Sequence, residues 1–226
     1  MIDTEAICVW IAELVPLAAT LFSLFYGIKH FFKKGKPLFL QTLTMAMGCH
    51  ALGSLYHLCL TLTSEELLEG FTPAYLGRIG FFLFLLTASY AQLDKIVDDG
   101  TVRMRKARLI ALVAPVLVIL LFIPNAMIED VPLSTKITYA IVWLPAVFSV
   151  YFNLKHTLIP NLDFGFVRAI KPYNALALAL SFAELLVLTA WDYYHLTQLV
   201  LTAFLFAALA IATMIAARKG AEQWVI

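Results

Sequence analysis

Charged side chains are scarce in this sequence. Of its 226 residues, 14% are charged and 62% are hydrophobic. A water-soluble domain is typically about 25% charged, so this chain carries more apolar surface than a soluble fold of its length could bury. The composition excludes a soluble globular protein. It predicts an all-α integral membrane protein, with the bilayer covering the outer faces of the helices.

Long polar segments are also absent. The longest connections between apolar runs, 96–108 and 159–173, are too short for a separate catalytic or DNA-binding domain. The N-terminus opens with Asp3 and Glu5 instead of the basic residues of a signal peptide, so we expect the first apolar run to be retained. Residues 1–226 are therefore predicted to form a single transmembrane domain.

Few residues are suited to cofactor chemistry. The three cysteines, Cys8, Cys49 and Cys59, form neither a Cys-x-x-Cys pair nor a metal-type spacing, so we expect them to serve in packing. A retinal protein needs a lysine in its last helix, and the last apolar run has none. The net charge of +1, with no basic stripe outside the loops, predicts no nucleic-acid partner. No cofactor or metal is assigned.

Long apolar runs, in contrast, recur along the whole chain. A helix needs about 20 mostly apolar residues to cross a hydrocarbon core about 30 Å thick. Seven runs meet this requirement, at 7–28, 38–63, 74–95, 109–129, 137–158, 174–195 and 196–218. The sequence therefore predicts seven transmembrane helices.

The loop charges predict how these helices are oriented. Loops rich in Lys and Arg stay in the cytoplasm. Every Lys and Arg except Arg78 and Lys136 lies on the same side, in alternate loops or in the C-terminal tail: Lys29, Lys33, Lys34, Lys36, Lys95, Arg103, Arg105, Lys106, Arg108, Lys155, Arg168, Lys171, Arg218 and Lys219. The N-terminus is therefore predicted outside and the C-terminus in the cytoplasm of a multi-pass cell-membrane protein, either a bacterial inner membrane or a plasma membrane.

The first and fifth predicted helices end in similar segments. Residues 22–30 (Phe-Ser-Leu-Phe-Tyr-Gly-Ile-Lys-His) align without gaps with 148–156 (Phe-Ser-Val-Tyr-Phe-Asn-Leu-Lys-His), and a loop closing in Lys-Pro follows each. This likeness predicts a 3+1+3 arrangement, in which 7–95 and 137–218 are parallel repeats and helix 109–129 links them. The alternative is that aromatic helix ends followed by a basic residue arose independently in the two places.

With seven helices, an outside N-terminus, this length and a parallel three-helix repeat, the chain resembles the SWEET sugar transporters and the wider PQ-loop group. The resemblance covers the topology of the whole chain and no motif. The sequence has no Pro-Gln dipeptide, and Pro16 and Pro145 lie in the outer thirds of their spans, whereas that family keeps its prolines in the cytoplasmic halves. The resemblance implies a class of architecture and not a sugar substrate.

Ionisable residues within the apolar runs mark a candidate site. Such a residue costs about 2.5 to 3.5 kcal/mol at a helix centre on insertion scales, so it typically faces the bundle interior. The ionisable residues here are Glu13 in the first run, His50 and His57 in the second, Arg78 in the third, and Glu184 and Asp192 in the sixth. Most lie in the predicted outer half, so we expect them to converge on one cavity open to the outside.

The spacing within the second run adds to this interpretation. His50, Ser54 and His57 lie on one helical face. Counted from the Lys-Pro pairs, His57 and Asp192 occupy equivalent positions of the two repeats, so they are predicted to face each other as a base and an acid. A histidine beside a carboxylate can change its charge near neutral pH, which suggests proton coupling.

The leading hypothesis is a small-molecule transporter or permease. Its predicted substrate-binding or proton-coupling residues are Glu13, His50, Ser54, His57, Arg78, Trp143, Glu184 and Asp192. Trp143 is expected to stack on the substrate. No catalytic residue is assigned, and the expected partners are the lipid bilayer, a small-molecule ligand, and a second copy of the chain or another membrane protein.

Three alternatives remain open at this point. The chain could be a seven-helix receptor or an accessory membrane subunit. It could also be a zinc-dependent hydrolase, because two His and two carboxylates suit zinc. The seven-helix alkaline ceramidase and progestin receptor superfamily, however, pairs a Ser with a His four residues later, whereas Ser54 and His57 are three apart. Finally, the ionisable residues could act separately, with Glu13 paired to Arg78 and Asp192 at the membrane interface.

Overall fold

The computed structural model describes residues 4–63, 71–97, 101–127, 132–159, 165–192 and 196–224. These residues form helices with short connections, and no strand occurs among them. The helices are α1 (Thr4–Phe31), α2 (Leu38–Thr63), α3 (Pro73–Val97), α4 (Val102–Ala111), α5 (Val113–Met127), α6 (Leu133–Leu158), α7 (Gly165–Asp192) and α8 (Leu196–Trp224). The predicted all-α class is confirmed.

Most of the helices have the length and composition of membrane spans. In the described part of the chain, six segments are long and apolar enough to cross a membrane: Glu5–Phe31, Leu38–Thr63, Met104–Pro124, Leu133–Leu158, Lys171–Thr189 and Leu196–Gln223. The apolar part of α3, Pro73–Ser89, is shorter. These segments support a multi-pass membrane protein, and together with α3 their number fits the seven predicted spans.

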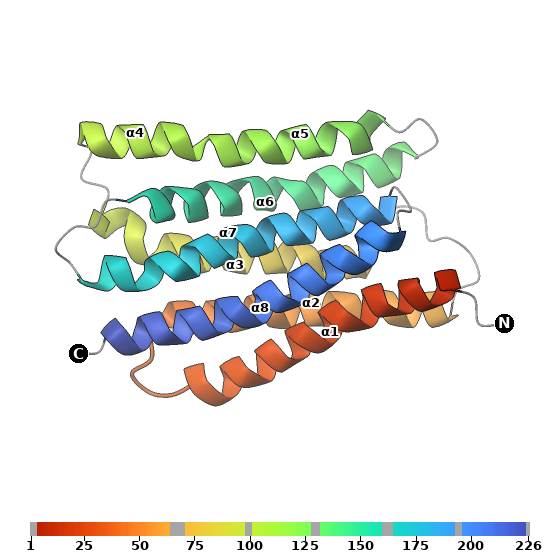
Figure 1. Ribbon diagram of the computed structural model, residues 1–226, viewed down its shortest axis with the longest axis horizontal. Coiled ribbons are helices and arrows are strands. Elements are labelled where there is room, and N and C mark those ends of the chain that lie inside the picture. The colour runs from red at the N-terminus through yellow and green to blue at the C-terminus, as the bar shows by residue number, and fades with distance from the viewer. Residues whose placement is uncertain are drawn as a thin grey trace.

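The fourth predicted span is two helices instead of one. Pro115 lacks the N–H group that would bond to the Ala111 carbonyl, and its ring crowds that carbonyl. α4 accordingly ends at Ala111, and the Leu112 N–H donates to the Leu109 carbonyl at 3.2 Å in a tighter turn. α5 begins at the next residue and continues along the same line (Figure 1).

The sixth predicted span begins earlier than expected. We expected a loop to close in Lys171-Pro172, but α7 begins at Gly165 and Pro172 lies inside it. Pro37, in contrast, directly precedes α2. A membrane helix tolerates an internal proline when neighbouring groups satisfy the freed backbone carbonyl. The two Lys-Pro pairs therefore occupy different structural positions.

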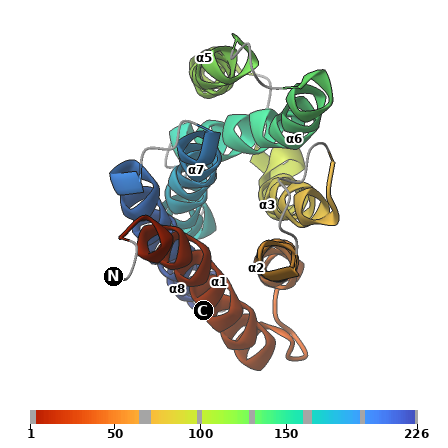
Figure 2. The same ribbon diagram turned by 90° about the vertical axis from the view of Figure 1, so that its right-hand side faces the viewer.

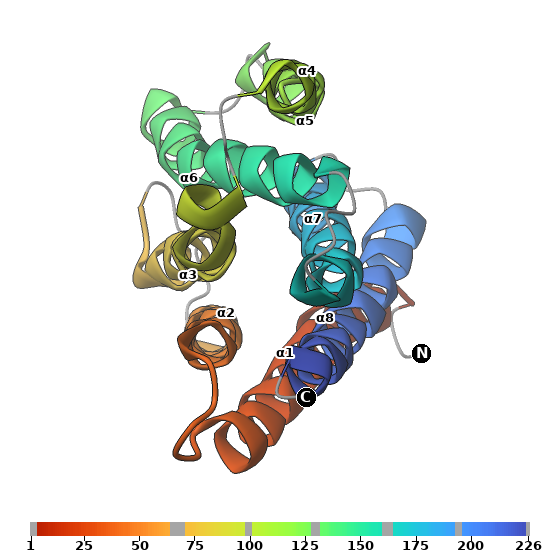
Figure 3. The ribbon, with the colours of Figure 1, turned by 90° about the vertical axis from the view of Figure 1, so that its left-hand side faces the viewer.

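Six helices form a closed ring. α1, α2, α3, α6, α7 and α8 follow one another around it, and α8 packs against α1 to close it (Figure 2). α4 and α5 lie outside the ring against α6 (Figure 3). We call the ring's two runs of three helices, α1–α3 and α6–α8, its two units; they contact each other at an α3–α6 seam and an α8–α1 seam. The start of α1 and the end of α8 lie at opposite ends of the bundle, which we call its N-terminal and C-terminal ends (Figure 1).

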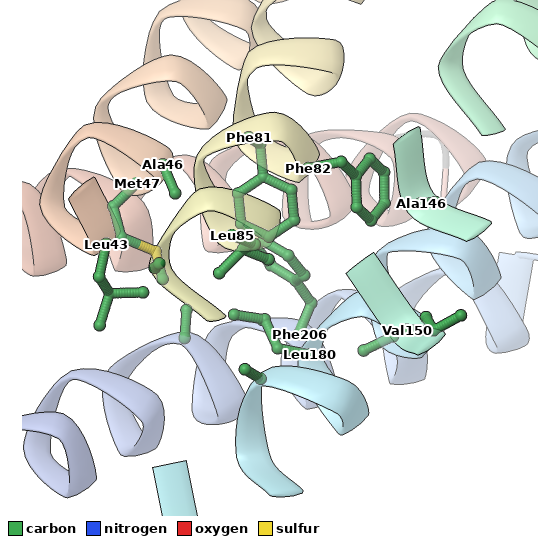
Figure 4. Close-up of a cluster of buried hydrophobic side chains, with 14 of the residues drawn as sticks. Leu43, Ala46, Met47, Phe81, Phe82, Leu85, Ala146, Val150, Leu180 and Phe206 are labelled. Atoms are coloured by element: carbon green, nitrogen blue, oxygen red, sulfur yellow. The ribbon is translucent and has the colours of Figure 1, made fainter. Parts of the chain in front are cut away.

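Apolar side chains fill the centre of the ring. Figure 4 shows the main contributors, which come from five of the six ring helices: Leu43, Met47, Phe81, Phe82, Leu85, Val150, Leu180 and Phe206. Each is fully buried. The ring is therefore a packed core and not an open pore.

Glycines bring α2 and α3 unusually close. A Cβ atom on Gly53 would lie 2.7 Å from the Ala74 carbonyl oxygen, and one on Gly77 would lie 2.5 Å from the Gly53 Cα. Small residues allow the backbones of membrane helices to approach in this way. Arg78 directly follows Gly77, so this close contact also brings the backbone of Arg78 near α2.

This contact can be tested with Gly53→Ala. The added methyl group would meet backbone atoms, so we expect the free energy of unfolding to fall by about 1 to 3 kcal/mol, as for other overpacked positions. Gly48→Ala in the same helix is the matched control, because its methyl group would meet the flexible side chain of Leu24 at 3.2 Å. Thermal unfolding of the purified protein in detergent measures both. Equal losses would contradict the close α2–α3 contact.

Candidate functional site

The carboxylate of Glu184 is the centre of the site. It lies on α7 and is 1% exposed. One carboxylate oxygen, Oε2, lies 3.0 Å from His50 Nε2 of α2. The other oxygen, Oε1, accepts a hydrogen bond from the Arg78 guanidinium of α3. One buried acid on the α6–α8 unit is thus bound by two side chains of the α1–α3 unit.

The imidazole of His50 contacts two aromatic rings, and each of its nitrogens has a polar partner. Its ring stacks on Phe206 with the centroids 4.5 Å apart, and it meets Phe81 edge-on at 5.3 Å. Ser54, one turn further along α2, places its hydroxyl 3.3 Å from His50 Nδ1. Both ring nitrogens therefore have a partner, which fixes the orientation of the ring. We call Glu184, His50, Arg78 and Ser54 the Glu184 cluster.

A second acid and histidine pair lies nearer the N-terminal end. Glu13 of α1 is 8% exposed, and its Oε1 atom lies 2.7 Å from Nδ1 of His57 on α2, whose side chain is 39% exposed. Sequence reasoning instead set His57 opposite Asp192, or Glu13 beside Arg78. Asp192 ends α7, and its side chain lies outside the described part of the chain.

The two acids share one small cavity. It is lined by Glu13, His50, Ser54, Arg78 and Glu184, together with the apolar residues Ala12, Pro16 and Val187. About 10 Å³ is available to the centre of a water molecule, which is room for about one water. The structure thus gathers five of the predicted site residues around one small cavity, in which the Arg78 guanidinium is bound to Glu184 and the Glu13 carboxylate also forms part of the lining.

Trp143 lies elsewhere. Its side chain on α6 is 3% exposed and packs on Phe122 of α5 with ring centroids 5.3 Å apart. It is not among the residues that line the cavity. The structure therefore places Trp143 where the α5 helix meets the ring, and does not bring it together with the other predicted site residues.

A neutral polar cluster lies nearer the C-terminal end of the bundle. The sequence analysis did not predict it. Ser89 of α3 donates to Asn153 Oδ1 of α6 at 2.6 Å. The Asn153 amide nitrogen donates to the Ser149 carbonyl at 2.9 Å, and the Ser149 hydroxyl lies 3.5 Å from that of Ser181 on α7. We call these four residues the Asn153 cluster. Its one signal in the sequence is an asparagine inside an apolar run.

The two clusters are neighbours along α7. Ser181 and Glu184 lie on one helical face, about one turn apart, and Asn174 lies on the same face towards the C-terminal end. Asn174 is 1% exposed, and its side-chain amide has no hydrogen-bond partner among the described residues. The inward face of α7 therefore carries polar groups over about 15 Å of its length, at 1.5 Å per residue.

Among the described residues, no group of three or more His, Cys, Asp and Glu side chains is arranged to hold a metal ion. The two histidines of α2 bind different acids, His50 binding Glu184 and His57 binding Glu13.

No family model, no curated protein and no solved structure matches the chain.

The strength of the central ion pair can be measured with Glu184→Gln. This change leaves the Arg78 guanidinium, whose side chain is only 12% exposed, without its bound carboxylate, so we expect the free energy of unfolding to fall by up to about 3 to 5 kcal/mol. Adding Arg78→Gln removes the stranded charge, so the double variant should lose less than the sum of the two single variants. Glu5→Gln, at the exposed start of α1, is the control and should change stability by less than about 0.5 kcal/mol. Additive losses at 78 and 184 would show that the two side chains do not interact.

Proposed function

We propose that this protein is a small-molecule transporter or permease of the cell membrane, with its N-terminal end facing outward. One observation carries the proposal: a buried carboxylate of one three-helix unit is bound by a guanidinium and an imidazole of the other, inside a ring of apolar helices. Ionisable groups that face the interior of a membrane bundle typically line substrate or ion pathways.

The order of helices in the ring supports the 3+1+3 arrangement. A two-fold axis along the membrane normal would exchange α1, α2 and α3 with α6, α7 and α8, and would exchange the α3–α6 seam with the α8–α1 seam. Both seams are packed, and the linking α4–α5 segment lies outside the ring. Ser23 and Ser149, which the repeat alignment makes equivalent, are both buried. In transporters built from such repeats, the substrate site lies between the repeats near the midplane.

The small size of the cavity supports an assignment of the transport state. Because the cavity has room for about one water, a substrate molecule does not fit in it, and we assign this structure to a state in which the pathway is shut. The two clusters close it at two depths: the Glu184 cluster holds the units together on the outer side, and the Ser89–Asn153 hydrogen bond holds them together on the inner side. Alternating access then requires the two contacts to open in turn.

A proton can control the outer contact. While Glu184 is ionised, its bonds to Arg78 and His50 are charge-assisted and therefore stronger than neutral ones. Protonation of Glu184 weakens both bonds, and this favours separation of the units on the outer side. The partly exposed Glu13–His57 pair beside the cavity supplies a route by which that proton reaches Glu184.

Transport is tested in proteoliposomes that contain a trapped pH indicator. Amino acids, carboxylic acids, sugars and amines are added in turn, and uptake is measured together with internal pH. We expect one of these classes to enter with acidification of the interior, and Glu184→Gln to remove the pH dependence because it deletes the titratable group. Glu5→Gln is the matched control and should transport normally. Unchanged pH-dependent uptake by Glu184→Gln would rule out proton coupling through this residue.

Accessibility of the two clusters tests alternating access directly. Cys8, Cys49 and Cys59 are free thiols and are first replaced by alanine. In that background, a membrane-impermeant thiol reagent should label Ser54→Cys from the outside and Ser149→Cys from the inside. Adding Glu184→Gln should speed outside labelling of Ser54→Cys several-fold, because it weakens the outer contact. Labelling of both positions from the outside alone would favour the receptor alternative over a transporter.

A further inference from the structure

A second cavity lies at the C-terminal end of the bundle, away from both polar clusters. It is formed by the end of α1, the turn that follows it, the start of α2 and the end of α8, and its lining includes His30, Lys33, Lys36, Arg218 and Glu222. About 110 Å³ is available to the centres of water molecules, so the cavity holds far more than one water. Its lining contains three cationic side chains and one acid.

The loop between α1 and α2 directs two lysines to this cavity. The Lys36 N–H donates to the Lys33 carbonyl at 3.2 Å, which closes a four-residue turn. Gly35 occupies the third position of the turn with φ +84°, a conformation that glycine adopts without strain. The turn brings Lys33 and Lys36 to the cavity wall. Lys33 and Lys34 are both exposed, but Lys34 does not line the cavity.

The third cation is held in a defined orientation. Arg218 Nε donates to Glu222 at 2.7 Å, and Arg218 Nη1 donates to the Tyr26 hydroxyl at 3.0 Å. The guanidinium also lies over the Tyr26 ring at 5.9 Å, and the same ring packs against His30 with centroids 4.6 Å apart. A guanidinium has five N–H donors, so these two bonds leave three for a ligand. Its planar fork suits the oxygens of a phosphate group.

We propose that this cavity binds a phosphate group, carried by an anionic lipid headgroup or by a soluble phosphate. Three cations from two segments far apart in the chain converge there against the one acid, Glu222, which is already bound by Arg218. The positive charges place this end of the bundle at the cytoplasmic face, where basic pockets between membrane helices bind anionic headgroups. Exposed apolar side chains beside the turn, Phe32 and Leu38, offer contact to an acyl chain. The site is independent of the proposed transport.

Binding is measured on the purified full chain with two probes. Inorganic phosphate is titrated against chloride at equal ionic strength, with the apparent melting temperature as readout. Phosphatidylglycerol and phosphatidylcholine are compared by native mass spectrometry. Stabilisation by inorganic phosphate assigns the site to a soluble phosphate, and retention of phosphatidylglycerol alone assigns it to a lipid headgroup. If neither probe binds, the proposal is wrong.

Variants distinguish binding by the residues that line the cavity from general attraction by any lysine nearby. Lys36→Gln should weaken binding about fivefold, the effect expected for one cation near an anionic headgroup, and Lys34→Gln in the same turn is the matched control. Equal weakening by both would overturn the proposal.

Two further variants test geometry at constant charge. Gly35→Ala strains the turn, and Arg218→Lys replaces the planar fork by a single ammonium group. Both should weaken binding at least as much as Lys36→Gln does, while transport activity is retained. Wild-type binding by both variants would show that charge alone attracts the phosphate, and would equally overturn the proposed site.

Discussion

A carboxylate buried in an apolar bundle must find its counter-charge inside the protein, and the helix contacts around Glu184 meet that requirement. Two side chains from neighbouring helices of the opposite unit meet it, His50 from α2 and Arg78 from α3. Both can reach one acid because glycines let α2 and α3 approach to backbone contact. The ion pair therefore depends on the close packing of α2 and α3. The ion pair also connects the α1–α3 unit to the α6–α8 unit across the ring.

The rest of the ring shows how polar groups are accommodated in an apolar bundle. Neutral groups of the Asn153 cluster satisfy one another across the α3–α6 seam. Between and around the clusters, side chains such as Phe81 and Phe206 exclude water (Figure 4). This exclusion strengthens each polar contact, because a buried polar group that loses its partner has no water to replace it. The two clusters therefore join the two units by polar contacts at two depths of the bundle.

The sequence identified the ionisable residues of the site, whose burial costs free energy, but it did not identify the partners that bind them. Glu13, His50 and Glu184 were recognisable because ionisable groups are rare in apolar runs. The pairing of Glu13 with His57, and of Glu184 with two residues, depends on how each helix is rotated about its axis, which hydropathy does not record. The Asn153 cluster was missed because neutral polar residues carry a weak signal. Trp143 was expected beside the substrate, yet it faces Phe122 of the α5 helix outside the ring.

The sequence by itself determined the all-α class, the multi-pass membrane character and a number of spans that fits the structure. These properties follow from the hydropathy of each segment, which does not depend on the segments that pack against it. It also placed most helix boundaries within a few residues, and it missed the α4–α5 break and the early start of α7, where prolines act through local backbone geometry. Only the tertiary structure decided the order of the helices in the ring, the position of α4 and α5 outside it, the small cavity between Glu13 and Glu184, and the convergence of Lys33, Lys36 and Arg218. These features depend on contacts between segments far apart in the chain, which periodicity within one segment cannot specify.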